Sequence, residues 1–267
     1  MESLRKYGKP PYRVAVVHGG PGAAGEMAPV ARKLSGSHGI LEPLQTAASI
    51  EGQLAELHDS LCFHGELPLT LIGHSWGAWL AYIFAARYPQ LVAKLILVGS
   101  GPFEGKYASG IMQTRLDRLD DAGRQRVNEL GALMEKAECS SESGDMNKAL
   151  AEFGRLMSKT DTFDMLPDVR EEVQLDMHIH QSVWQEASEL RRSGRLLELG
   201  RDISCPVLAV HGDYDPHPYL GVVEPLARVL ADFRHILLER CGHEPWIERY
   251  ARNEFFQLLE RELIKAV

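Results

Sequence analysis

Short apolar runs alternate with helical patterns along much of the chain. The runs are nearly continuous, which is typical of strands buried on both faces of a parallel sheet. We expect six strands, at 12–17, 40–44, 69–72, 95–98, 206–210 and 236–238. Helical patterns lie between or after them, at 50–63, 75–87, 225–231 and 247–264. This order predicts an α/β fold with a mostly parallel central sheet flanked by helices.

Residues 102–200 interrupt this alternation, because they hold no convincing strand pattern. Three helical patterns occur there instead, at 111–138, 144–158 and 168–192. The segment carries 19 Asp and Glu against 13 Lys and Arg, and therefore most of the net charge of −8. We expect a core made of residues 1–101 and 201–267, with residues 102–200 inserted between two of its strands.

Composition and charge exclude several classes of protein. The chain of 267 residues is 45% hydrophobic and 25% charged, as in folded globular proteins. No cluster of Lys and Arg is present, so nucleic acid is not an expected partner. The longest unbroken apolar run, 78–86, is far shorter than the roughly 18 residues that span a bilayer. The first ten residues lack an apolar secretion segment, and no C-x-x-C occurs, so we expect no membrane partner and a cytoplasmic location.

The segment Gly73-His74-Ser75-Trp76-Gly77 matches G-x-S-x-G between an expected strand and an expected helix. A sharp strand-to-helix turn holds such a serine in strained backbone geometry with its hydroxyl exposed. The flanking glycines are needed because neighbouring backbone passes too close for a Cβ. Ser75 is therefore the expected catalytic nucleophile, at the positive end of the following helix dipole.

Backbone N–H groups must stabilise the negative oxygen that forms when such a serine attacks a carbonyl carbon. One donor is expected from Trp76, the residue after the nucleophile. The other is expected from the glycine-rich loop His18-Gly19-Gly20-Pro21-Gly22 after the first expected strand. Gly20 is the favoured donor and Gly19 the alternative. Neither this loop nor the rest of the chain holds a phosphate-binding motif, so we expect no cofactor.

The acid and the base are expected after later strands. Asp213 and Asp215 follow the strand expected at 206–210, and Asp215 is favoured because it lies deeper in the loop. His243 follows the last expected strand and is the expected base. His217 could imitate a base, but it precedes the last strand, and we interpret it as a solvated loop histidine.

The motifs HGGPG, GHSWG, HGDYD and CGH, in this order, resemble the α/β-hydrolase superfamily over essentially the whole chain. The resemblance implies that Ser75 is the nucleophile and that His243 is the general base and then the acid. It implies that Asp215 orients the imidazole and that Gly20 and Trp76 donate to the oxyanion. The insertion at 102–200 resembles the helical cap that covers the nucleophile in this superfamily.

Two features depart from the family pattern. An antiparallel hairpin usually precedes the strand that leads into the oxyanion loop, but only eleven residues precede Tyr12, so we expect that hairpin to be missing. The HGGPG loop resembles that of proline iminopeptidases. Those enzymes usually carry GGSWG at the elbow, whereas this chain has His74 at the second position.

The leading hypothesis is a serine hydrolase that cleaves a small ester or amide through an acyl-enzyme. Its substrate would be a small molecule or a short peptide. A proline-iminopeptidase-like aminopeptidase and a non-enzymatic ligand receptor on the same fold are the alternatives, beside a C–C bond hydrolase. Ser75 argues against haloalkane dehalogenases and epoxide hydrolases, which resemble this fold but have Asp at that position. The oligomeric state is left open.

Several residues are weaker candidates for the substrate pocket. Gly19 borders the oxyanion loop, Phe103 follows a strand end, and Trp184 either lines the pocket or packs the cap on the core. Four cap carboxylates are candidates to bind a cationic α-amine, although solvated helix faces are the favoured interpretation: Glu171, Glu172, Asp176 and Glu186. His178 and His180 point to nearly opposite sides of a helix, so no metal site is expected.

Overall fold

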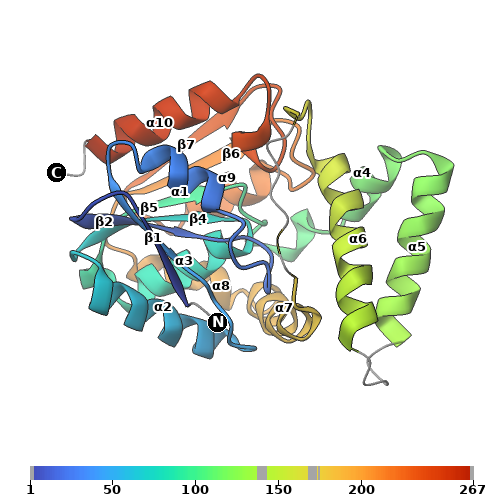
Figure 1. Cartoon of the computed structure of the whole chain (residues 1–267), viewed down its shortest axis with the longest axis horizontal. Helices are drawn as coiled ribbons and strands as arrows, with labels where there is room; N and C mark the ends of the chain where they lie inside the picture. The colour runs from blue at the N-terminus through green and yellow to red at the C-terminus, as the bar shows by residue number, and fades with distance from the viewer. Residues whose placement is uncertain (1–2, 137–142, 168–172, 174, 265–267) are drawn as a thin grey trace.

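Seven strands form one sheet in the order β1-β3-β2-β4-β5-β6-β7 (Figure 1). The computed structural model describes residues 3–136, 143–167, 173 and 175–264. The strands are β1 Leu4–Tyr7, β2 Tyr12–Val17, β3 Gly39–Pro43, β4 Leu69–His74, β5 Val92–Val98, β6 Val207–Gly212 and β7 Phe233–Leu238. Neighbouring strands are parallel except for β1, which runs antiparallel to β3. The expected α/β fold with a mostly parallel sheet is confirmed.

The structure contains one strand, β1, that is not among the six predicted from the sequence. Its four residues, Leu-Arg-Lys-Tyr, lie at the edge of the sheet and hold two charged side chains, so they give only a weak apolar signal. β1 pairs with β3 rather than with β2, from Leu4 opposite Pro43 to Tyr7 opposite Ile40. The described residues therefore contain no hairpin before β2, as expected, but the sheet keeps one antiparallel edge strand.

Helices cover both faces of the sheet (Figure 1). They are α1 Ala28–Leu34, α2 Ile50–His64, α3 Trp76–Arg87, α9 Leu220–Leu226 and α10 Arg252–Ile264. On β2, Val14 and Val16 pack with α1 and α10, whereas Ala15 and Val17 pack with α2 and α3. Both sides of the strand are thus removed from water, which explains why the strand signal is a continuous apolar run.

The chain reverses its direction of travel across the sheet at β2. From β2 the chain adds β3 on one side, and then crosses to place β4 on the other side. The loops after β2 and β4 therefore leave from adjacent carboxyl ends with no crossing helix between them. In open parallel sheets this crevice is where ligands bind.

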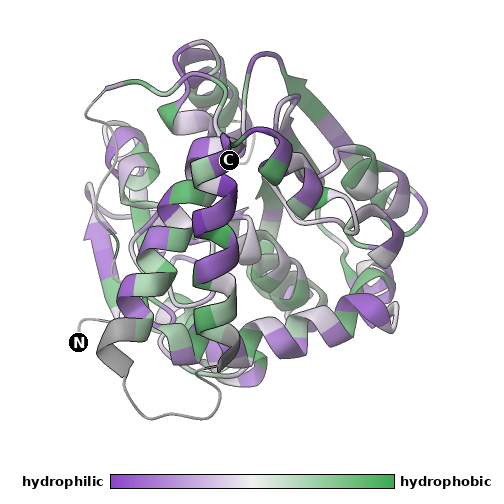
Figure 2. Ribbon diagram, turned by 90° about the vertical axis from the view of Figure 1, so that its right-hand side faces the viewer, coloured by the Kyte–Doolittle hydropathy of each residue, from purple (hydrophilic) through white to green (hydrophobic). Residues whose placement is uncertain are grey.

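The described residues between β5 and β6 form five α-helices: α4 Ile111–Asp117, α5 Asp121–Lys136, α6 Ser143–Asp161, α7 Met177–Arg192 and α8 Arg195–Glu198. The helical insertion is thereby confirmed. α5 and α6 lie side by side at the end of the molecule that faces the viewer in Figure 2, where their ribbons alternate between hydrophobic and hydrophilic positions. None of the described helices has both the length and the apolar character needed to cross a membrane.

The helix expected over 111–138 is divided in two. α4 ends at Asp117, and the Asp120 carboxylate accepts a hydrogen bond from the Gly123 N–H at 2.8 Å. A side-chain oxygen that accepts from the N–H three residues later starts a new helix. Of the helix expected over 168–192, residues 177–192 form α7, and residues 168–172 and 174 lie outside the described residues.

Two phenylalanines provide a matched test of the packing. Phe84 on α3 is fully buried, whereas Phe63 on α2 is 80% exposed. Phe84→Ala should lower the free energy of unfolding by about 3–5 kcal/mol, because it leaves a cavity in the core. Phe63→Ala should change it by less than about 0.5 kcal/mol. Urea denaturation measures both, and equal losses would contradict this packing.

Candidate active site

Ser75 lies at the turn between β4 and α3 with φ 52° and ψ −114°. Such positive φ values are rare for residues other than glycine and store strain. The turn is so tight that a Cβ on Gly73 would lie 2.2 Å from the Gly77 carbonyl oxygen. A Cβ on Gly77 would lie 2.3 Å from the Val17 carbonyl oxygen. The two glycines of G-x-S-x-G are therefore required by contact with backbone.

The Ser75 side chain is the accessible member of a buried turn. Its neighbours His74 and Trp76 are 1% and 3% exposed, whereas Ser75 is partly exposed. The Ser75 N–H donates to the Val98 carbonyl oxygen on β5 at 3.0 Å, which fixes the backbone. The hydroxyl donates no hydrogen bond to any residue in the described part of the chain, so it is free to meet a ligand.

Asp215 is the carboxylate that contacts His243. The His243 Nδ1–H donates to Asp215 Oδ2 at 2.7 Å, and the Asp215 side chain is fully buried. Asp213, the alternative acid, is exposed and accepts from the Cys241 N–H at 3.1 Å instead. The two loops that follow β6 and β7 thus meet through one hydrogen bond between a carboxylate and an imidazole.

Burial and charge act in opposite directions on this pair. Burial lowers the pKa of His243, but the charge and hydrogen bond of Asp215 outweigh it and raise that pKa to about 9. Burial raises the pKa of Asp215, but the neighbouring histidines hold it well below its usual range. Asp215 is therefore an anion across the physiological range, and His243 binds a proton more tightly than a free imidazole does.

His217 is a second imidazole on the same carboxylate, and its interpretation as a solvated loop histidine is wrong. Its backbone N–H and its Nδ1–H donate to Asp215 Oδ1 at 2.9 and 2.8 Å. Its ring centroid lies 4.5 Å from that of His243, and only 13% of its side chain is exposed. Burial, together with the charge of His243, lowers the pKa of His217 to about 4, so it is neutral. The signal in the sequence is Asp-Pro-His, because an aspartate often accepts from the backbone N–H two residues later.

Asp215, His217 and His243 also form a group with potential metal-ligand atoms within 4.8 Å of one another. Each imidazole Nδ1 already donates to an oxygen of Asp215. A metal ion at this point would have to displace both hydrogen bonds. The three side chains therefore form two hydrogen-bonded pairs, in which His217 and His243 each donate to one oxygen of Asp215.

The glycine-rich loop after β2 lies against the turn that carries Ser75. A Cβ on Gly19 would lie 3.1 Å from Ser75 Cβ, and Gly20 has φ 34°. The Gly19 N–H donates to Glu26 Oε2 at 2.6 Å and is therefore occupied. The N–H groups of Gly20 and Trp76 donate to none of the residues that the structure describes. Of the two glycines, Gly20 is the one whose N–H is free to bind a ligand.

Two of the residues expected in the substrate pocket have packing roles. Phe103 is fully buried, and its ring lies 4.9 Å from that of Tyr82, so it belongs to the core instead of a substrate-contacting surface. Trp184 on α7 stacks on Trp79 of α3 with ring centroids 6.0 Å apart, and 40% of it remains exposed. Trp184 thus packs the inserted helices on the core.

The acidic residues considered for binding an amine are also occupied where they are described. Asp176 accepts from the Ile179 N–H at the start of α7, and Glu186 accepts from the Ile50 N–H at the start of α2. Both carboxylates therefore stabilise helix N-termini. Glu171 and Glu172 lie outside the described residues. His180 donates from Nδ1 to the Pro21 carbonyl oxygen, so it joins α7 to the glycine-rich loop after β2.

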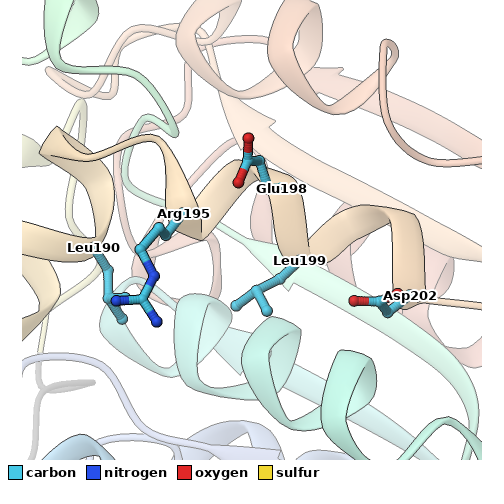
Figure 3. A pocket seen from close by; sticks show the side chains of 5 residues that line it. All are labelled: Leu190, Arg195, Glu198, Leu199 and Asp202. Atoms are coloured by element: carbon cyan, nitrogen blue, oxygen red, sulfur yellow. The ribbon is translucent and has the colours of Figure 1, made fainter.

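A separate pocket lies where α7, α8 and the following 3-10 turn Leu199–Asp202 meet (Figure 3). Its volume is about 270 Å³. Leu190 and Leu199 form its apolar part, and three charged residues, Arg195, Glu198 and Asp202, complete its lining. None of the expected catalytic residues lines it, so it is distinct from the site at Ser75.

The inserted helices contact the loop that carries His243 through a buried carboxylate. Glu248 is fully buried and accepts hydrogen bonds from three backbone N–H groups. The donors are Gly242 at 2.7 Å, Phe163 at 2.8 Å and Asp164 at 2.9 Å. The His243 N–H also donates to the Asp161 carbonyl oxygen at 2.8 Å. The end of α6 and the histidine loop therefore form one hydrogen-bonded unit.

A sequence model described as the alpha/beta hydrolase family matches residues 14–254. The chain therefore belongs to the alpha/beta hydrolase family, a class of hydrolytic enzymes, and the resemblance stated from its motifs is confirmed. A 54-residue segment is 33% identical to Epoxide hydrolase 4 of Mus musculus. That segment is 20% of this chain and spans 15% of that relative's length.

Solved structures of low sequence identity share the fold. VinJ has a TM-score of 0.70 at 16% identity, over 99% of this chain and 95% of that chain. A monoacylglycerol lipase of Paleococcus ferrophilus has a TM-score of 0.63 at 16% identity, over 99% and 98%. The proline iminopeptidase of Mycobacterium smegmatis has a TM-score of 0.61 at 19% identity, over 98% and 94%.

The substitution Glu248→Gln tests whether the buried carboxylate stabilises the fold by accepting from these three backbone N–H groups. An amide keeps one acceptor oxygen and turns N–H donors toward backbone N–H groups, so buried donors lose their partner. We expect a loss of about 2 kcal/mol in stability, seen as a fall of about 4–8 °C in Tm. The exposed Glu254 on α10 provides the control, because Glu254→Gln should leave Tm unchanged. If Glu248→Gln had the same Tm as wild type, the stabilising role of the Glu248 carboxylate would be wrong.

Proposed function

We propose that this hydrolase cleaves a small ester or amide through an acyl-enzyme on Ser75. In this proposal His243 is the general base and then the acid, and Asp215 orients its imidazole. Gly20 and Trp76 donate to the oxyanion, and residues 102–200 act as the cap. The observation that carries the proposal is Ser75, held at φ 52° on a strand-to-helix turn, with a hydroxyl that bonds none of the described residues.

The first half of the reaction follows from the proton positions. With Nδ1–H donating to Asp215, neutral His243 keeps its Nε2 lone pair to accept the hydroxyl proton of Ser75. The serine oxygen then attacks the carbonyl carbon, and the carbonyl oxygen becomes negative. The unpaired N–H groups of Gly20 and Trp76 can donate to that oxygen. The buried negative charge of Asp215 stabilises the imidazolium while the charge lasts.

Bond cleavage and release follow by proton return. The His243 imidazolium gives its proton to the departing alkoxide or amine, which leaves an ester on Ser75. Water then loses a proton to His243 and attacks the ester carbon. The second oxyanion collapses, His243 returns the proton to the serine oxygen, and the acid leaves. No external oxidant or cofactor takes part in these steps.

Other reaction types have less support. Two of the four carboxylates considered for amine recognition, Asp176 and Glu186, serve as helix caps, which weakens the aminopeptidase alternative. Epoxide hydrolases of this fold have Asp at the elbow position, whereas this chain has Ser75, which argues against epoxide hydrolysis. The names of similar structures include lipases and a thioesterase domain, which favours oxygen and sulfur esters for a first trial.

A fluorophosphonate probe tests the nucleophile directly. Wild type should be labelled, whereas Ser75→Ala and His243→Ala should not, because phosphonylation needs an activated serine. Ser109→Ala, at an exposed serine outside the site, should label like wild type. Labelling that persists in Ser75→Ala would overturn the proposal, because another residue would then be the nucleophile. A folded wild type that never labels would overturn it in favour of a ligand receptor.

The substrate class is then measured with a chromogenic panel. We expect p-nitrophenyl acyl esters to be hydrolysed with a burst of p-nitrophenol, since the acyl-enzyme accumulates when its hydrolysis is slow. Prolyl and alanyl amides carrying the same type of reporter test the aminopeptidase alternative. Turnover of the amides with no turnover of the esters would replace the ester proposal with that alternative.

The pH dependence follows from the raised pKa of His243. Because the neutral imidazole is the base, kcat/KM should rise about tenfold per pH unit up to a midpoint near pH 9. In Asp215→Asn the buried histidine loses its anion, so the midpoint should fall below pH 7 while the rate drops by about 10³–10⁴. A pH–rate profile from pH 5 to 10 measures both, and an unchanged midpoint would exclude Asp215 as the partner.

A further inference from the structure

A buried contact joins the oxyanion loop to the turn that carries the nucleophile. Glu26 Oε2 accepts from the Gly19 N–H at 2.6 Å and lies 3.0 Å from His74 Nδ1. The His74 ring is 1% exposed, and the Glu26 side chain is 22% exposed. One carboxylate oxygen thus holds a residue after β2 and the residue that precedes Ser75.

The other side of the His74 ring reaches the histidine loop. His74 Nε2 donates to the His243 carbonyl oxygen at 3.1 Å, and the two rings lie with centroids 4.7 Å apart. A carboxylate and a carbonyl oxygen are both acceptors, so each ring nitrogen of His74 faces one acceptor. The His74 ring therefore bridges Glu26 and the backbone of His243.

The surroundings leave little room for another arrangement. A Cβ on Gly19 would lie 2.4 Å from Glu26 Oε2 and 2.7 Å from His74 Nδ1, so a larger residue at position 19 would displace the pair. Trp246 meets the His74 ring edge-on at 4.6 Å. Burial raises the pKa of Glu26, but the charge of His74 lowers it to about 2. The carboxylate therefore stays ionised while it holds the loop.

We propose that Glu26 and His74 are positioning residues that fix the oxyanion loop, the nucleophile turn and the His243 loop relative to one another. This inference deepens the proposed serine hydrolase and rests on it. The pair touches no reacting atom. It acts by binding the Gly19 N–H, which leaves the next N–H, that of Gly20, to meet the oxyanion, and by holding the backbone of His243.

The pair also accounts for the departure of the elbow from the iminopeptidase pattern. A glycine at position 74 has no side chain that could bridge Glu26 and the His243 carbonyl oxygen. The presence of histidine at position 74 is therefore explained by its contact with Glu26, seven residues beyond Gly19. The G-x-S-x-G motif itself allows any residue at that position. Substitution of either member should displace the same three loops, so the effects of the two should not add.

A double-mutant cycle in the full chain tests this coupling. We expect Glu26→Gln and His74→Gln each to lower kcat for a p-nitrophenyl ester by about 10- to 100-fold with a smaller change in KM, because misplaced catalytic groups reduce the rate more than binding. The double variant should be no slower than the slower single variant. Glu239→Gln and His64→Gln, both at exposed positions, are the matched controls and should retain the wild-type rate. The proposal would be overturned if the two decreases in kcat were additive in the double variant. It would also be overturned if the substitutions raised KM and left kcat unchanged.

A spectroscopic measurement separates this proposal from the proposed activity. In ¹⁵N-histidine NMR, the ring signals of wild-type His74 are assigned by their loss in His74→Gln. In Glu26→Gln the Nδ1 signal should shift, because Nδ1 loses its carboxylate partner. A wild type that neither labels nor hydrolyses would refute the serine hydrolase but leave this signal intact. A His74 Nδ1 signal that is the same in Glu26→Gln as in a labelled, active wild type would refute the positioning pair alone.

Discussion

The site depends on how closely the first turn of α3 approaches the end of β2. Backbone oxygens of Val17 and Gly77 occupy the space that side chains would fill at positions 77 and 73. That contact forces the chain to turn sharply at Ser75, which adopts φ 52° as a result. The same contact brings the loop after β2 against Ser75. The strained serine and the glycine-rich loop are therefore two consequences of one steric constraint.

Three buried or half-buried carboxylates then place the loops around that turn. Glu26 holds the glycine-rich loop after β2, Asp215 holds two imidazoles, and Glu248 holds the histidine loop on the end of α6. A carboxylate removed from water must find donors, and backbone N–H groups at loop ends are the donors at hand. The acidic residues of this chain thus act at short range, as anchors for backbone, as well as through its net charge.

The coupling of the inserted helices to the core follows the same principle. The His243 N–H binds the Asp161 carbonyl oxygen, and His180 binds the Pro21 carbonyl oxygen. α6 and α7 therefore contact the two loops that flank Ser75. A change in the angle of these helices would therefore move both loops, since each contact is made to the backbone of a loop.

Local patterns in the sequence determined the mostly parallel sheet, the elbow at Ser75 and the chain order of Asp215 and His243, because burial on both faces and close backbone contact restrict which residues fit. Tertiary structure alone decided which groups meet. It placed Glu26 between Gly19 and His74 and put His217 on Asp215. It also buried Phe103 in the core, and added β1 to the edge of the sheet through pairing with the distant β3. These outcomes depend on contacts between segments far apart in the chain, whose geometry no local pattern of residues carries.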